Sequence, residues 1–165
     1  MNKITLLLIF SCLTLGSIAQ NKFGHLDSQE LLLLMPERKS AETELSDFAK
    51  SLDAQLASMA AEYQNIVQEY QSNEATYTDL VKKDKIAEVT ALEQRIQTFQ
   101  QNAQQSLQAK EKDLLEPILR KIETAIEDVA KEGKYTYIFN KSGGTILYAK
   151  DSENVIGLVK KKLGL

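Results

Sequence analysis

The chain has 165 residues, of which 26% are charged, with 20 Lys and Arg against 23 Asp and Glu, one histidine and one cysteine. This acidic balance argues against nonspecific binding to nucleic acid, which depends on a basic surface. The single histidine, His25, excludes a metal site built from several histidines.

The first nineteen residues have the pattern of a cleavable secretory signal. Lys3 supplies the positive start, residues 4–15 form an apolar run, and Ser17-Ile18-Ala19 fits a cleavage site of small residues. We predict removal of residues 1–19, which takes away Lys3 and changes the net charge from −3 to −4. The mature chain then lacks Cys12 and forms no disulfide. An alternative stays open, in which a lipoprotein signal ends at Cys12 and this residue carries a lipid.

The middle of the chain has the composition of long paired helices. No glycine lies between Pro36 and Glu132, and Pro117 is the only proline inside that span. Apolar side chains recur there in steps of three or four residues, the pattern of a coiled-coil seam with a stutter after Leu52. The seam consists of Leu45, Phe48, Leu52, Leu56, Met59, Tyr63, Ile66 and Tyr70. It weakens at residues 71–74, where we predict the tip of a helical hairpin.

The returning half of the hairpin is poorer in apolar residues. Its face is diluted by glutamines at 94, 97, 100, 101, 104, 105 and 108. A sparse apolar face buries little surface, so we expect arms of modest stability that can splay. From Leu114 the apolar face becomes wider, as in a helix that enters a buried body. The sequence therefore predicts a helical-hairpin arm over residues 36–114.

Short β-like segments flank this arm, and they predict a β-rich body formed by residues 20–35 and 115–165. Residues 22–27 read as a strand that ends at a helix cap, Asp27-Ser28. Gly133 is expected to end the long helix. Residues 135–139 and 145–148 are expected to pair as a β-hairpin, and Asp151-Ser152 to cap a closing helix.

The body carries more apolar side chains than a small monomeric unit could bury, which predicts a homotrimer. The residues expected in this trimer body are Phe23, Leu26, Tyr137, Phe139, Ile146 and Tyr148. The fold class is thus mostly α with a small β body, from which a coiled-coil hairpin projects.

The order and spacing of several local motifs resemble the OmpH/Skp family of periplasmic chaperones, over essentially the whole mature chain. The motifs are Phe23-Gly24-His25-Leu26-Asp27, Leu34-Met35-Pro36-Glu37, Leu115-Glu116-Pro117-Ile118, Tyr137-Ile138-Phe139-Asn140 and Ile146-Leu147-Tyr148. The resemblance implies a jellyfish-like trimer in the periplasm, whose helical arms surround a cavity that holds unfolded outer-membrane proteins without ATP. Asn140 stands where this family often has an aspartate. The best-known members are strongly basic, so contact of this acidic chain with lipopolysaccharide or a membrane surface stays open.

No set of residues in the sequence predicts an enzyme or a cofactor site. Residues 142–144 lack the rest of a phosphate-binding loop, and the carboxylates are scattered along helical faces. Tyr63, Tyr70 and Tyr77 recur every seven residues, so we expect them on nearly one face of the first arm. They fit the seam between the arms, which we favour, or, together with Met59, a surface that contacts clients.

We therefore expect an ATP-independent periplasmic holdase that keeps unfolded outer-membrane proteins from aggregating. The alternative is a structural coiled-coil adaptor that spaces components of the cell envelope. A continuous, strong seam without a cavity would favour the adaptor, and the weakened seam favours the holdase.

Overall fold

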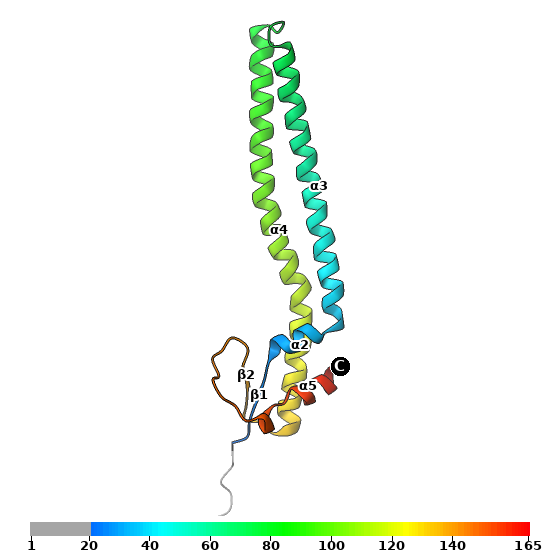
Figure 1. Ribbon diagram of the computed structural model, residues 1–165, viewed down its shortest axis with the longest axis vertical. Helices are drawn as coiled ribbons and strands as arrows, with labels where there is room; N and C mark the ends of the chain where they lie inside the picture. The colour runs from blue at the N-terminus through cyan, green and yellow to red at the C-terminus, as the bar shows by residue number, and fades with distance from the viewer. Residues whose placement is uncertain (1–20) are drawn as a thin grey trace, which may run out of the picture. The chain divides into compact units, whose positions relative to one another are not determined.

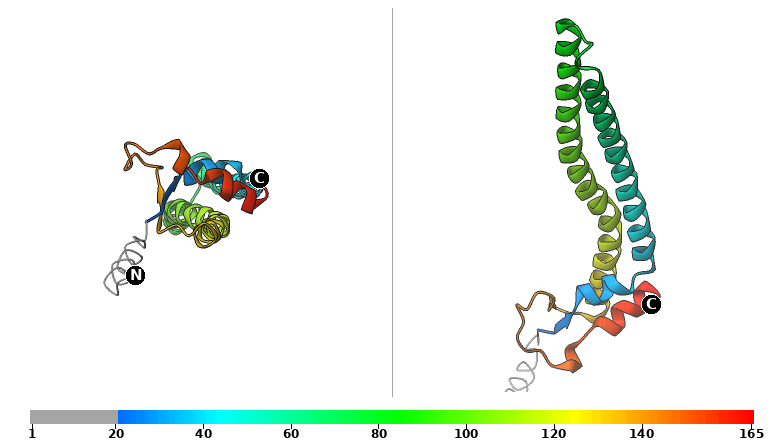
Figure 2. Two further views of the ribbon diagram at one scale, coloured as in Figure 1. Left: turned by 90° about the horizontal axis from the view of Figure 1, so that it is seen from below. Right: turned by 45° about the horizontal axis from the view of Figure 1, so that its top comes forward.

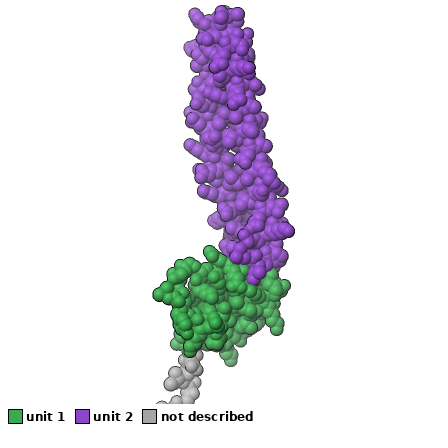
Figure 3. Space-filling view, viewed as in Figure 1, with its two compact units in different colours: residues 1–31, 122–165 green, residues 32–121 purple. Residues whose placement is uncertain are grey.

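The computed structural model describes residues 21–165. The expected signal peptide, with its two candidate processing points at Ala19 and Cys12, lies outside the described residues. The chain forms two compact units: unit 1 contains the described residues up to Leu31 together with Ile122–Leu165, and unit 2 contains Leu32–Lys121 (Figure 3).

Unit 2 is a hairpin of two long helices. Helix α3 spans Pro36–Asn73 and helix α4 begins at Asp79 and runs to Gly133, so that its last part belongs to unit 1. Figures 1 and 2 show α3 and the first part of α4 side by side along the hairpin. Pro36 occupies the first turn of α3, where its missing N–H removes no helical hydrogen bond. The predicted turn at residues 71–74 is confirmed, because α3 ends within it.

The seam of the hairpin is thinly buried. In unit 2 the buried apolar side chains of the two long helices are Ala41, Ile66, Leu92 and Ile118. Most other seam positions, such as Leu56 and Tyr63, are only half-buried. Ion pairs join the helices at the surface, from Lys110 to Glu44 and from Lys121 to Glu37. Because exposed ion pairs of this kind contribute little, the hairpin depends mainly on a narrow apolar contact.

Unit 1 contains a two-stranded parallel sheet packed against helices. Strand β1 (Phe23–Leu26) pairs with β2 (Tyr137–Asn140), with Phe23 opposite Tyr137 and Leu26 opposite Asn140. On its other side β1 meets the segment after the short 3-10 helix η1 (Asp151–Glu153), through a bridge from His25 to Asn154. Helices α2 (Ser28–Leu34) and α5 (Ile156–Leu163) complete the set of elements in Figure 1. The core consists of Leu26, Leu31, Ile122, Ala125, Val129, Val155 and Val159.

The expected β-hairpin between residues 135–139 and 145–148 is wrong. Residues 145–148 form no strand, and β2 pairs instead with β1 in parallel. Both edges of β1 are taken, by β2 and by the segment around Asn154, so residues 145–148 have no strand beside them in the single chain. A strand needs partners for its backbone groups, and an apolar run in the sequence does not show which partner it will find.

One expected helix end is confirmed and one cap needs correction. Helix α4 ends at Gly133 as expected, although the left-handed residue that follows the helix is Lys134, with φ of 52°. Gly133 is also required for space, because a Cβ there would lie 2.4 Å from the ring of Tyr135. The closing helix α5 follows Val155, whose side chain makes no cap, and Asn154 Oδ1 accepts a hydrogen bond from the N–H of Ile156. Asp151-Ser152 forms part of η1 and does not cap α5.

The cap predicted at the start of α2 is confirmed. Asp27 Oδ1 accepts hydrogen bonds from the N–H groups of Gln29, at 2.9 Å, and Glu30, at 3.3 Å. The amide of Asn140 supports the same turn, since its Nδ2 donates to Ser28 Oγ and its Oδ1 accepts from Ser28 N–H. A carboxylate at position 140 could accept from the same N–H and from the Ser28 hydroxyl as donor, so either residue fits this contact.

Candidate functional site

The hairpin carries an open groove of about 710 Å³ between α3 and α4, which we call the hairpin groove. Its lining residues are Gln55, Ser58, Met59, Ala91, Gln94, Arg95, Thr98, Phe99 and Asn102. Met59 and Phe99 are half-buried, whereas the other lining residues are exposed. The groove therefore combines an apolar floor with a polar rim.

Met59 is the one expected client-contact residue that lines this groove. Phe99 and Arg95 were missed as site residues by the sequence analysis. Phe99 is visible in the sequence as the one aromatic residue of the glutamine-rich half, and Arg95 as the only cation between Lys85 and Lys110. The signal for both residues is that a single basic residue lies close to an aromatic residue on a helix that is otherwise rich in glutamine.

The three expected tyrosines divide between two places. Tyr63 is half-buried on α3, and Tyr70 and Tyr77 meet near the tip with ring centroids 6.4 Å apart and an interplanar angle of 48°. The expectation that all three lie on the first arm is wrong for Tyr77, because α3 ends at Asn73 and Tyr77 lies in the connection to α4. Its ring folds back toward α3.

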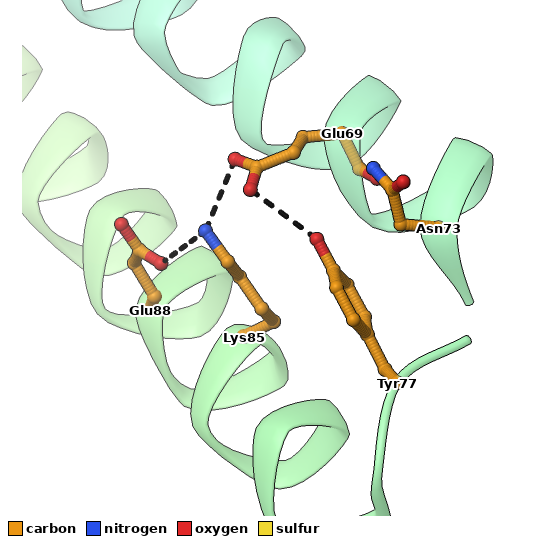
Figure 4. A network of polar contacts seen from close by, with 5 residues as sticks. All are labelled: Glu69, Asn73, Tyr77, Lys85 and Glu88. Carbon is orange, nitrogen blue, oxygen red and sulfur yellow. Dashed lines mark hydrogen bonds and ion pairs between the residues drawn. The ribbon is translucent and has the colours of Figure 1, made fainter. Parts of the chain in front are cut away.

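The polar groups at the tip form a small network, the tip cluster of Glu69, Tyr77, Lys85 and Glu88 (Figure 4). The carboxylate of Glu69 accepts hydrogen bonds from Lys85 Nζ at 3.0 Å and from the Tyr77 hydroxyl at 3.2 Å. The hydrogen bond from Lys85 lowers the pKa of Glu69, and the same contact raises the pKa of Lys85. The cluster thus connects the end of α3, the turn and the start of α4.

The pKa shifts give the tip cluster a defined pH dependence. Because the pKa of Glu69 is lowered in the folded chain, its carboxylate stabilises the tip at pH values above the ordinary pKa of 4.5. This stabilisation is lost as the pH falls through the pKa that Glu69 has in the folded chain. Because the pKa of Lys85 is raised in the folded chain, its ammonium group stabilises the tip at pH values below the ordinary pKa of 10.5. This stabilisation is lost as the pH rises through the pKa that Lys85 has in the folded chain. Contacts at the tip should therefore hold between these limits and weaken in acid and in strong base.

Replacing Lys85 by methionine should loosen the tip at neutral pH, because Glu69 then loses its cationic partner. We expect lower hydrogen-exchange protection of the amides around Tyr77 at pH 7, and a smaller loss of protection on acidification than in the unmodified chain. Lys83→Met is the matched control, since Lys83 is exposed and outside the cluster. Equal protection in Lys85→Met and Lys83→Met would contradict the role of the cluster.

Unit 1 presents a different kind of surface, an exposed aromatic face made by Phe23, Tyr137 and Phe139. Their ring centroids lie 6.0 to 6.2 Å apart, and the three residues are 43%, 60% and 46% exposed, respectively. These three expected trimer-body residues thus lie together and are open to solvent in the single chain. Contiguous exposed apolar side chains of this kind are typical of protein interaction surfaces.

The other expected trimer-body residues are placed differently. Leu26 is only 1% exposed and lies in the core of unit 1, where its own chain buries it. Ile146 is half-buried, and Tyr148 is 81% exposed on the segment that follows β2. Gly24, His25 and Leu26 are all buried, so Phe23 is the one residue of β1 that is exposed.

Within residues 21–165, no three His, Cys, Asp or Glu side chains gather where they could hold a metal ion. None of the helices in this range combines the length and the apolar character needed to cross a membrane. His25 is buried, and its Nε2 lies 2.9 Å from the backbone oxygen of Lys150. It connects β1 to the chain before η1 and serves the packing of unit 1.

These features define a class of protein: a long two-helix hairpin inserted between the first and last segments of a small α/β unit, with exposed aromatic and groove surfaces. The chain belongs to the OmpH family, described as outer membrane protein (OmpH-like), because the family pattern matches residues 22–163.

A solved structure supports the fold. The chain is similar to a crystal structure from Caulobacter crescentus described as a candidate outer membrane chaperone (OmpH-like), with a TM-score of 0.75 and 16% sequence identity. The similarity covers 89% of this chain and 86% of that one. No curated protein sequence matches this chain.

Proposed function

We propose that this protein is an ATP-independent holdase chaperone of the periplasm that binds unfolded outer-membrane proteins and prevents their aggregation. The observation that carries the proposal is membership of the OmpH-like family over residues 22–163, nearly the whole chain. The similar Caulobacter crescentus structure, described as a candidate chaperone, supports the same class of function.

The hairpin has properties that suit such a role. Its seam is mostly half-buried, and its helices leave an open groove with an apolar floor. A thin apolar contact gives a low cost for local separation of the helices, so the hairpin can adapt to clients of different size. Many weak contacts made by several arms at once add up to tight holding of an unfolded chain.

A homotrimer forms part of the proposal. The aromatic face of Phe23, Tyr137 and Phe139 is the surface we assign to contact between copies, and Ile146 and Tyr148 lie on the neighbouring segment of the chain. Three hairpins carried by one assembly would surround a client and keep its unpaired strand edges from those of other chains. Tyr63, Tyr70 and Tyr77 are assigned to the seam, and Met59 to client contact.

The function is tested by diluting a urea-unfolded outer-membrane β-barrel protein into buffer and following light scattering. We expect the purified chain to suppress aggregation completely near one assembly per client, with no change on addition of ATP. Suppression that requires ATP, or no suppression at any ratio, would contradict the holdase. Binding to folded envelope proteins without suppression of aggregation would favour the structural adaptor instead.

A further inference from the structure

The lining of the hairpin groove has an apolar floor, which suits the side chains of a peptide, and a polar rim, which suits its backbone. Its half-buried floor, Met59 and Phe99, is apolar, and its volume of about 710 Å³ is several times the roughly 150 Å³ that encloses a benzene ring. Methionine adapts its shape to different apolar partners, and an aromatic ring gives a large contact area. The floor can therefore accept one large apolar side chain, or more than one, of varied shape.

The rim of the groove offers hydrogen bonds of both kinds. Gln55, Gln94 and Asn102 each carry an amide, which has two N–H donors and a carbonyl acceptor. An extended chain segment presents free backbone N–H and C=O groups that need such partners. The exposed amides can thus pair with the backbone of a bound segment whatever its side chains are.

Arg95 is the only charged residue in the groove lining. It is also isolated in the sequence, because no Lys or Arg lies between Lys50 and Lys82, and none other than Arg95 lies between Lys85 and Lys110. Glu69, Glu44 and Glu37 of unit 2 pair with lysines, and within residues 21–165 Arg95 has no ion-pair partner. A free guanidinium at the edge of an apolar floor is suited to a carboxylate, which it can bind with two parallel hydrogen bonds.

We propose that the hairpin groove binds extended segments in which a large apolar side chain stands next to a carboxylate, with Arg95 selecting the carboxylate and Met59 and Phe99 holding the apolar side chain. The inference rests on the proposed holdase function and names which segments of an unfolded client the hairpin prefers. The contact with Arg95 strengthens the binding of acidic clients. It offsets the repulsion between such a client and this protein, whose own net charge is negative.

The test uses the full chain and fluorescein-labelled peptides of equal length, in a Gly/Ser background, with a leucine next to aspartate, asparagine or lysine. Fluorescence anisotropy should give tightest binding for the aspartate peptide, by about twofold to fivefold over the asparagine peptide, and weakest binding for the lysine peptide. This preference should decrease as the salt concentration rises.

Two variants separate the parts of the groove. Arg95→Gln should remove the preference between the aspartate and asparagine peptides and leave binding of the asparagine peptide unchanged. Met59→Gln should weaken all three peptides by about threefold to tenfold and keep the preference. Lys83→Gln is the charge control and Ile86→Gln the apolar control, since both residues are exposed on α4 outside the groove. Both controls should match the unmodified chain.

Persistence of the preference in Arg95→Gln, or its equal loss in Lys83→Gln, would overturn the inference in favour of a general charge effect. If the chain self-associates without peptide and Met59→Gln abolishes this self-association, a second copy of the chain occupies the groove and the inference is overturned.

Suppression of aggregation is measured on the same variants. If the chain suppresses aggregation but shows no Arg95-dependent preference, the groove assignment is wrong and the holdase function stands. If the chain shows the preference but does not suppress aggregation, the holdase function is wrong and the groove assignment stands.

Discussion

Replacing Tyr137 and Phe139 together by threonine is expected to dissociate the proposed trimer while each chain stays folded. Threonine favours strand conformation, so β2 should persist, and both side chains are largely exposed in the single chain. Each ring brings about 150–250 Å² of surface, so covering the exposed half of two rings contributes about 4–6 kcal/mol per chain at roughly 25 cal/mol per Å². Loss of such a term shifts association by about three orders of magnitude or more.

Sedimentation equilibrium at micromolar concentration measures this effect. The unmodified chain should give three times the mass of one copy, and the double variant the mass of one copy. Leu158→Gln is the matched control, because Leu158 is an exposed apolar residue of unit 1 on α5, away from the aromatic face, and should leave the trimer intact. A single-copy mass for the unmodified chain, or a trimer of the double variant, would contradict the assigned surface. Circular dichroism checks that the double variant keeps its helices.

Replacing Tyr63, Tyr70 and Tyr77 together by alanine should lower the melting temperature of the hairpin, and client binding should fall only as a consequence. Tyr63 and Tyr70 are half-buried, and Tyr70 contacts the ring of Tyr77, so each replacement removes packing from the thin seam. The loss should be on the order of 1–2 kcal/mol for each ring, since the sites are partly open.

The corresponding triple replacement by phenylalanine is the control, because it keeps the rings and removes only the hydroxyl groups. It should preserve the Tyr70–Tyr77 ring contact and lose the hydrogen bond from Tyr77 to Glu69. Circular dichroism melts are compared with client-binding titrations for both variants. Unchanged melting of the alanine variant with weakened client binding would move these residues from the seam to the client surface.

The sequence alone determined the long helical hairpin. A span without glycine, an apolar repeat every three or four residues, and its interruption at residues 71–74 depend on local helix geometry, so they can be seen in one chain. The cap at Asp27 was equally local, because a carboxylate three residues before a helical N–H is enough to form it. The likeness to the OmpH/Skp family depended on the order of such motifs and is confirmed by the family match.

Only the tertiary structure decided which strands pair and which apolar residues remain exposed. The partner of β2 is β1, which lies before the whole hairpin in the chain, and strand periodicity carries no information about so distant a neighbour. For the same reason Leu26 and Phe23, three residues apart on one strand, could not be separated by composition into core and surface. Gly133 ends α4 as expected, but only the structure shows that Lys134 takes the left-handed conformation and that the ring of Tyr135 needs the space at Gly133. The groove of Met59, Arg95 and Phe99 likewise exists only where two helices distant in sequence lie side by side, since a surface shared by two elements is fixed by their packing and not by either sequence alone.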